Sequence, residues 1–214
     1  MSFDALTPLP VSFFDQDAAT VAAQLLGRWL VRELPEERES PGGRSILEIV
    51  ETEAYLGGPD RASHAWGGRR TPRNESLYLP PGHAYVYFIY GMHFCLNVVT
   101  GRPHPGAAVL FRAGEPLEGE EAMAARRGLG TPAGPGDLAG GPGKLCQALA
   151  VDRSQDGLAL TRTEGGLWLA EGRPDHAAPL ATGPRIGVAY AGEAAAWPLR
   201  FARPGNRHVS RPRL

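Results

Sequence analysis

The sequence of 214 residues has few of the residues that build disulfide frameworks, metal sites or membrane spans. It contains two cysteines, Cys95 and Cys146, which lie far apart without the spacing of zinc ligands, so neither a disulfide framework nor a zinc site is expected. No apolar run approaches the ~20 residues of a membrane helix, and no apolar signal segment follows the N-terminus. We therefore expect a cytoplasmic protein without a metal, a cofactor or a membrane partner.

Lysine is nearly absent, because the 22 basic residues include a single lysine, Lys144. The net charge of -1 is unevenly distributed. Residues 1–60 carry 4 arginines and 11 acidic residues, residues 61–112 carry 6 arginines and one acid, and residues 200–214 carry five arginines and no acid. Such asymmetry can build a basic face on a nearly neutral protein. The alternative is a chance cluster of solvated arginines.

Glycine and proline are abundant, with 28 and 20 residues, which favours many turns over a helical bundle. Apolar periodicity predicts helices at 17–30, 117–127 and 142–149, strands at 45–55, 107–112, 158–161, 167–169, 185–189 and 199–202, a hairpin at 84–97 that turns near Gly91, and loops at 35–44, 57–82 and 128–143. We find no repeat and no second domain boundary. The expected fold is one mixed α/β (α+β) domain over 1–214, with a curved antiparallel sheet, outer helices and a protruding β-hairpin.

Two carboxylates stand two residues apart on the strand expected at 45–55. Side chains alternate between the faces of a strand, so Glu51 and Glu53 share one face with Tyr55, whereas Glu48 points to the other. We expect this strand to be half-buried. The carboxylates then either line the edge of a cleft or belong to an acidic strand that faces solvent.

The hairpin expected at 84–97 carries tyrosines on both faces. Tyr85, Tyr87 and Ile89 share one face, and Phe88 and Tyr90 lie on the other. A buried phenol must find a hydrogen-bond partner, so not all of these tyrosines suit a core. Aromatic side chains near arginine and histidine are typical of a surface on which bases stack. An amphipathic hairpin with tyrosines at its rim is the alternative.

Several long motifs resemble one known family. They are EIVETEAYLGGPDRASHAWGGRRTPRN, YVYFIYGMHFCLNVV, AAVLFRAGEPLEG, GPGKLCQAL, RIGVAYAGE and PLRF, in this order along most of the chain. Together they resemble the alkyladenine (3-methyladenine) DNA glycosylases, and the lack of a long basic N-terminal extension favours a bacterial member. The resemblance implies a base-excision-repair enzyme that flips alkylated or deaminated purines out of duplex DNA. It would hydrolyse the N-glycosidic bond and leave an abasic site.

The resemblance also implies roles for individual residues. Glu53 matches the general base that activates water, and Arg112 and the main chain of Ile186 match groups that hold that water. Three aromatic walls of the base pocket match Tyr55, His64 and Tyr87, and Asn97 matches the residue that crowds the 2-amino group of guanine. Tyr90 matches the side chain inserted into the minor groove, with Met92 and His93 beside it. His93 stands where a tyrosine is expected, which affects the groove contact and not the chemistry.

Contacts to phosphate are expected from basic side chains near these motifs. Lys144 lies at the start of the helix expected at 142–149, where backbone N–H groups also favour anions. Arg69 and Arg73, together with Arg70 and the C-terminal arginines, are further candidates. Each of them is equally compatible with an ordinary solvated residue.

The expected chemistry needs no metal. A base inside a duplex must be extruded at a cost of a few kcal/mol, and aromatic walls attract an N-alkylated cationic purine. One carboxylate can then stabilise the oxocarbenium-like sugar and activate water. Without a lysine nucleophile beside the pocket, we expect a monofunctional glycosylase that acts as a monomer at the nucleoid. A non-catalytic module that binds damaged DNA, or a hydrolase of small nucleosides, would use only part of this residue set.

Overall fold

A computed structural model describes residues 6–34, 43–101, 104–130, 133–173 and 178–214. The strands are β1 (Trp29–Glu33), β2 (Arg44–Tyr55), β3 (Ala84–Ile89), β4 (His93–Val99), β5 (Ala108–Glu118), β6 (Leu167–Ala170), β7 (Ala181–Gly183) and β8 (Arg200–Ala202). The helices are α1 (Val11–Phe14), α2 (Ala18–Gln24), α3 (Glu120–Arg126) and α4 (Pro142–Ala148), with short 3-10 turns η2 (Trp66–Gly68), η3 (Glu75–Tyr78), η4 (Arg153–Gln155) and η5 (Ala189–Ala196).

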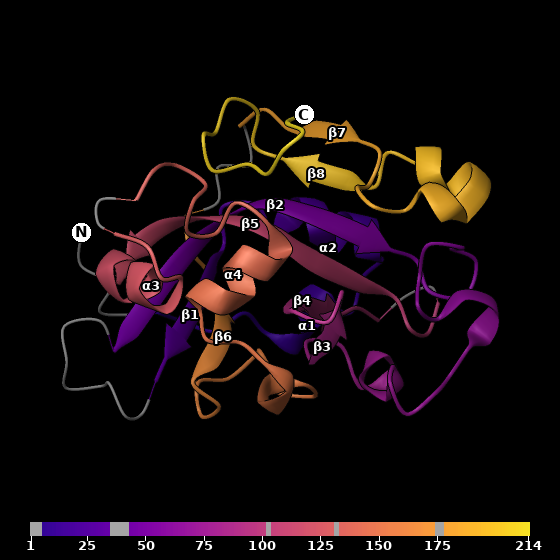
Figure 1. Cartoon of the computed structure of the whole chain (residues 1–214). Coiled ribbons are helices and arrows are strands. Elements are labelled where there is room, and N and C mark those ends of the chain that lie inside the picture. Colours follow the sequence, from indigo (N-terminus) through magenta and orange to yellow (C-terminus); the bar gives the residue numbers. More distant parts are fainter. Residues whose placement is uncertain (1–5, 35–42, 102–103, 131–132, 174–177) are drawn as a thin grey trace.

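All of these strands join one antiparallel sheet in the order β3-β4-β5-β2-β1-β6, and β8 adds to β2 and carries β7. The sheet curls, with β2 and β5 running through its middle (Figure 1). Strand β2 has two partners along one edge, because Arg44–Glu48 pairs with β1 and Glu51–Glu53 pairs with β8. The second half of β2 is thus enclosed between β5 and β8.

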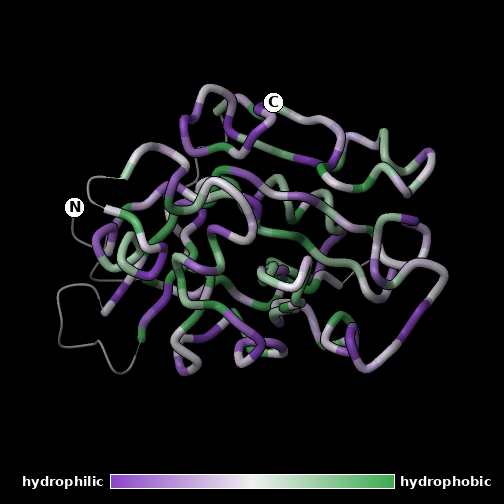
Figure 2. The backbone as a smooth tube through the Cα atoms, in the orientation of Figure 1, coloured by the Kyte–Doolittle hydropathy of each residue, from purple (hydrophilic) through white to green (hydrophobic). Residues whose placement is uncertain are grey.

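The main apolar core lies between this sheet and its helices. It includes Leu25 beside α2, Phe111 of β5, Leu145 of α4 and Leu169 of β6, each with no exposed surface. Hydrophilic residues are frequent in the outer turns, whereas the strands carry both hydrophobic and hydrophilic residues (Figure 2). The core takes residues from Leu9 to Phe201, and the expected mixed α/β fold with a curved antiparallel sheet is confirmed. That residues 1–214 form one domain stays a prediction.

The helix predicted at 17–30 is wrong in its second half. Asp17 caps α2 by accepting from the Thr20 N–H at 2.9 Å, as helix-starting aspartates do. The helix stops before Gly27, whose φ of 86° suits glycine, and Leu30 belongs to β1. The apolar spacing of Leu25, Leu26 and Leu30 reflects burial of a helix and then of a strand in the same core.

Other predicted strands need correction. The strand at 107–112 continues as β5 to Glu118, and the helix expected from 117 starts only after Gly119, whose φ is 79°. Segment 158–161 forms only an isolated bridge at Ala159, and 185–189 is not a strand. The strand that precedes β8 is β7, which pairs with it.

The remaining predicted elements agree more closely. The hairpin at 84–97 is β3–β4, α4 covers 142–148, and β6 and β8 lie where strands were expected. The loop expected at 57–82 contains η2 and η3, and most of the loop at 35–44 lies outside the described residues. Strand β2 is present but is not half-buried, because both of its faces are covered.

Candidate active site

Glu51 and Glu53 lie on β2 where it runs between β5 and β8, and neither has any exposed surface. The pairing of β2 with β5 shifts register on both sides of Glu51, and such irregularities re-aim side chains. Arg112 of β5 contacts both carboxylates, with Nε 3.1 Å from Glu51 Oε1 and Nη1 3.3 Å from Glu53 Oε1. The alternative of an acidic strand facing solvent is therefore wrong.

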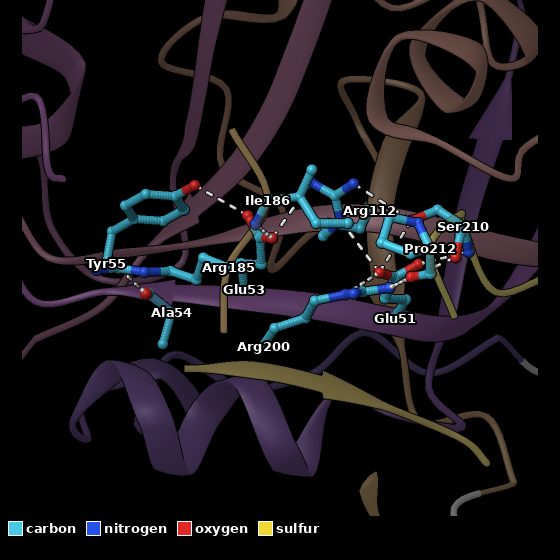
Figure 3. A network of polar contacts seen from close by, with 10 residues as sticks. All are labelled: Glu51, Glu53, Ala54, Tyr55, Arg112, Arg185, Ile186, Arg200, Ser210 and Pro212. Carbon is cyan, nitrogen blue, oxygen red and sulfur yellow. Dashed lines mark hydrogen bonds and ion pairs between the residues drawn. The ribbon is translucent and has the colours of Figure 1, made fainter. Parts of the chain in front are cut away.

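Three groups hold the Glu53 carboxylate (Figure 3). The backbone N–H of Ile186 donates to Oε1 at 2.7 Å, Arg112 pairs with the same oxygen, and the Tyr55 hydroxyl donates to Oε2 at 2.9 Å. Burial raises the pKa of Glu53 above its usual value, while the charge of Arg112 and the hydrogen bonds from Ile186 and Tyr55 lower it in part. The geometry thus brings together residues from three motifs that lie far apart in the sequence, because Glu53 and Tyr55 share one motif and Arg112 and Ile186 belong to two others.

Glu51 ties the C-terminal segment to this cluster. Its Oε1 accepts from Arg200 Nε at 2.6 Å and from the Ser210 hydroxyl at 2.9 Å, and its Oε2 accepts from the Ser210 N–H at 2.7 Å. Arg112 Nη2 in turn donates to Ser210 Oγ at 3.2 Å. Arg112 is thus held from the side opposite Glu53 by Glu51 and by Ser210, and of these two residues only Glu51 was singled out from the sequence (Figure 3).

A buried ion pair positions the segment that carries Ile186. Arg185 binds Asp60 through both terminal nitrogens, and neither side chain has exposed surface. The Arg185 guanidinium also donates to the Ala54 carbonyl at 2.9 Å and lies 4.7 Å from the centre of the Tyr55 ring. Breaking a buried pair of this kind costs about 3–5 kcal/mol. Asp60 and Arg185 were not singled out from the sequence, because 125 residues separate them.

A pocket of about 570 Å³ opens beside the carboxylates. It is lined by Tyr55, His64, Tyr85, Tyr87, Asn97, Arg112 and Ile186, among others, so all three partners of Glu53 form part of its wall. The His64 and Tyr87 ring centres are 4.6 Å apart, and His64 Nδ1 lies 2.7 Å from the Tyr85 hydroxyl. Buried Asn97 donates to the Tyr85 carbonyl at 3.0 Å. We call this cavity the aromatic pocket.

Tyr85 was not among the site residues chosen from the sequence, although it shares a strand face with Tyr87. The period-two spacing of the two residues was the available signal. In the structure their ring centres are 5.3 Å apart, and both line the aromatic pocket. Tyr85 is nearly fully buried, so its hydroxyl needs the partner that His64 supplies.

The tip of the hairpin carries two exposed side chains. Tyr90 and Met92 are 78% and 69% exposed. Tyr90 has a φ of 54°, lies in the turn and lines the aromatic pocket. Its expected position on the strand face opposite Tyr85 and Tyr87 is wrong, because a residue in the turn no longer follows the alternation of the strand. His93 lines the same pocket and packs against Gly143 at the start of α4.

The expected phosphate contacts fall into two groups. Arg69 and Arg73 are exposed beside the aromatic pocket, and Arg73 donates to the Phe88 carbonyl at 3.0 Å. Lys144 is half-buried and donates to the Gly136 carbonyl at 3.1 Å, while Arg70 pairs with Glu75. Arg200 is buried against Glu51 and is not a surface contact, so the C-terminal arginines do not form one exposed cluster.

Among the described residues, no group of three or more histidine, cysteine, aspartate or glutamate side chains is placed to hold a metal ion. None of the helices in this part of the chain is both long and apolar enough to cross a membrane. The free cysteines Cys95 and Cys146 are both buried.

Comparison with known proteins gives a consistent result. The family model described as methylpurine-DNA glycosylase (MPG) matches residues 12–207. The chain belongs to the methylpurine-DNA glycosylase family. The DNA-3-methyladenine glycosylase of Homo sapiens is 46% identical over 96% of this chain and 68% of its own length. A Methanocella arvoryzae protein provisionally named a 3-methyladenine DNA glycosylase is 45% identical over 95% of the chain and 96% of its own length, and the mouse relative is covered over 60% of its length.

The resemblance inferred from the motifs is thus confirmed. Membership in the methylpurine-DNA glycosylase family also confirms the expected enzyme class, a DNA-repair glycosylase that hydrolyses the N-glycosyl bond of damaged purines. The identities to the Homo sapiens and Burkholderia lata relatives are 46% and 43%, so a bacterial source stays a prediction. The roles of individual residues also stay predictions.

Proposed function

We propose that this chain removes alkylated or deaminated purines from double-stranded DNA by directing one water molecule with Glu53. The observation that carries this proposal is the buried Glu53 carboxylate, which is held by Tyr55, Arg112 and Ile186, three residues that line the aromatic pocket. A purine in that pocket would present its glycosidic bond near the cluster. The product would be an abasic site and a free base.

The hydrogen-bond pattern leaves one acceptor site of Glu53 unused. An ionised carboxylate has about four acceptor sites, and Ile186, Arg112 and Tyr55 use three of those of Glu53. The remaining site lies on Oε2, so a water bonded there would give its proton to Glu53 as it attacks the sugar. The negative charge of Glu53 also stabilises the positive charge that develops on the sugar as the base leaves.

Substrate selection follows from the walls of the pocket. The faces of Tyr55, Tyr87 and His64 attract a purine that carries a positive charge, by roughly 0.5–2 kcal/mol for each cation–π contact. Asn97 is fixed by its bond to the Tyr85 carbonyl, and its bulk would exclude the 2-amino group of guanine. Tyr90, Met92 and His93 would occupy the groove that the extruded nucleotide leaves.

The reaction is expected to stop at the abasic site. A strand-cleaving lyase needs an amine nucleophile, and the only lysine of the chain, Lys144, does not line the aromatic pocket and is bonded to the Gly136 carbonyl. We further expect Arg69, Arg73 and Lys144 to contact DNA phosphates. The protein would act as a monomer at the bacterial nucleoid, which sedimentation with and without duplex DNA would test.

The proposal is tested by Glu53→Gln in single-turnover excision of 7-methylguanine from a duplex. Glutamine keeps the size but accepts no proton, so the rate should fall by about 10²–10⁴-fold while binding of the damaged duplex persists. Glu51→Gln is a poor control, because buried Glu51 holds Arg112, Arg200 and Ser210. Glu48→Gln is better matched, since Glu48 lies on the same strand and lines neither pocket. Near-native excision by Glu53→Gln would contradict the proposal.

A further inference from the structure

A second pocket of about 380 Å³ lies next to the aromatic pocket. The two share part of their walls, including His64, Tyr85 and Tyr190, so the His64 ring stands between them. The other walls of the second pocket come from the loop at 61–74 and from η5, which meet at one end of the molecule (right in Figure 1). Its volume falls within the ~300–1,000 Å³ of small-molecule sites. Nothing in the reaction assigned to Glu53 uses this pocket, which we call the arginine pocket.

The charge of the arginine pocket favours an anion. Arg61, Arg69 and Arg73 line it, and among its described lining residues none is an aspartate or glutamate. Within the described chain, the guanidinium groups of Arg61 and Arg69 make no hydrogen bond or ion pair. Partial burial lowers the pKa of His64, and the charges of Arg73 and Arg69 lower it further, so positive potential reaches the wall shared with the aromatic pocket. Arginine recognises phosphate through paired hydrogen bonds.

The same pocket also offers aromatic faces. Trp66 is 52% exposed and Tyr190 is 63% exposed, which is unusual for such large apolar rings. The Arg61 guanidinium lies 5.4 Å from the centre of the Trp66 ring, and Tyr190 donates to the Ala62 carbonyl at 3.3 Å, so both rings are held at the pocket. Exposed aromatic rings beside arginines are the combination on which single-stranded nucleotides bind.

We propose that the arginine pocket binds one nucleotide of the damaged strand next to the extruded purine, with its phosphate between Arg69 and Arg73 and its base against Trp66 and Tyr190. This inference rests on the proposed function of the neighbouring aromatic pocket. The substrate it implies is a damaged purine whose neighbour is itself unpaired, as at a bulge or in a single-stranded stretch. A neighbour that stays stacked in a duplex would not reach Trp66.

The first test is tryptophan fluorescence of the full chain during titration with 2′-deoxyadenosine 5′-monophosphate. Trp29 and Trp168 are buried, so exposed Trp66 should dominate any quenching. We expect saturable quenching that is lost in Trp66→Phe and kept in Trp197→Phe. The affinity for the nucleotide should fall about tenfold or more in Arg69→Gln. It should not change in Arg162→Gln, because Arg162 lines neither pocket. Deoxyadenosine and inorganic phosphate should each bind more weakly. Equal binding of phosphate alone, or no quenching, would overturn the proposal.

The second test measures excision of 7-methylguanine from duplexes in which the adjacent nucleotide, on either side, is paired or unpaired. An unpaired neighbour eases extrusion for any enzyme, so the informative quantity is the ratio of kcat/KM between the two duplexes. This ratio should be about tenfold larger for the native chain and Trp66→Phe than for Trp66→Ala. Equal ratios would refute the nucleotide subsite. If the native chain excises nothing from either duplex, the proposed function fails, and the titration still decides whether the pocket binds a nucleotide.

Discussion

Tyr55 donates a hydrogen bond to Oε2 of Glu53, the oxygen at which we propose that the attacking water binds. This hydrogen bond therefore influences the pH at which the Glu53 carboxylate is protonated. Burial raises the pKa of Glu53, and the Tyr55 hydroxyl is one of the groups that oppose this rise. For a cationic leaving base, excision requires ionised Glu53, so the rate should fall as the pH decreases through that raised pKa. For a neutral base such as hypoxanthine, protonation of the leaving group adds an opposite limb and gives a bell-shaped profile.

Tyr55→Phe should move the acid limb of 7-methylguanine excision to higher pH, because ionised Glu53 loses a hydrogen bond while its burial remains. Rates from pH 4 to 8 under single turnover measure the midpoint. Tyr78→Phe is the control, since its hydroxyl donates to the Arg69 carbonyl and does not contact Glu53. An unchanged midpoint in Tyr55→Phe would mean that Glu53 does not produce the acid limb.

At the scale of elements, the β3–β4 hairpin exposes Tyr90 and Met92 at its tip. Tyr90→Ala should lower excision of a well-paired lesion by roughly 10–100-fold, but less for a mismatched lesion, whose extrusion costs less. Tyr90→Phe keeps the ring and should restore most of the activity. Parallel single-turnover rates on the two duplexes measure the effect. Equal losses on paired and mismatched lesions would argue against insertion into the groove.

The C-terminal segment is the second element that bears on the site, because Ser210 contacts both Glu51 and Arg112. Hydrogen bonds to charged groups contribute about 1.5–3 kcal/mol, so Ser210→Ala should lower both the free energy of unfolding and kcat, with a smaller change in KM. Denaturant unfolding and steady-state excision measure the two effects.

Ser76→Ala is the matched control for the C-terminal contact. Its hydroxyl donates to Asp156 at 2.8 Å, away from both pockets. This variant should lose stability and keep kcat. If the two serine variants behave alike, Ser210 supports the fold without positioning Arg112.

At the scale of the whole molecule, a net charge of -1 coexists with an arginine-rich region beside the pocket. Binding of undamaged duplex should weaken as salt rises, with a slope of log K against log salt of about -0.9 for each phosphate contacted. The double variant Arg69→Gln, Arg73→Gln should flatten this slope, whereas Arg162→Gln should leave it unchanged. Titrations between 50 and 200 mM salt measure the slopes. A flat dependence in the native chain would exclude a basic DNA-binding face.

The sequence by itself determined the features that depend on neighbouring residues. Alternation on β2 brought Glu51, Glu53 and Tyr55 to one cluster, and β-prone residues around Gly91 predicted the hairpin. Long motifs identified the family, and the comparisons confirmed it. These inferences held because strand periodicity and turn chemistry act over a few residues.

Only the tertiary structure decided how Glu53 is surrounded. Arg112, Arg200 and Ser210 surround Glu51, and Arg112, Tyr55 and Ile186 surround Glu53. Both carboxylates are therefore buried, whereas alternation alone represents them as half-exposed. Ser210 lies 159 residues from Glu51, and Arg185 lies 125 residues from Asp60, so no local pattern could pair them. Helix and strand also share the apolar spacing of residues 17–30, and the left-handed turn at Gly27 separates them. Contacts between distant segments depend on how the sheet closes, and local propensity does not encode that closure.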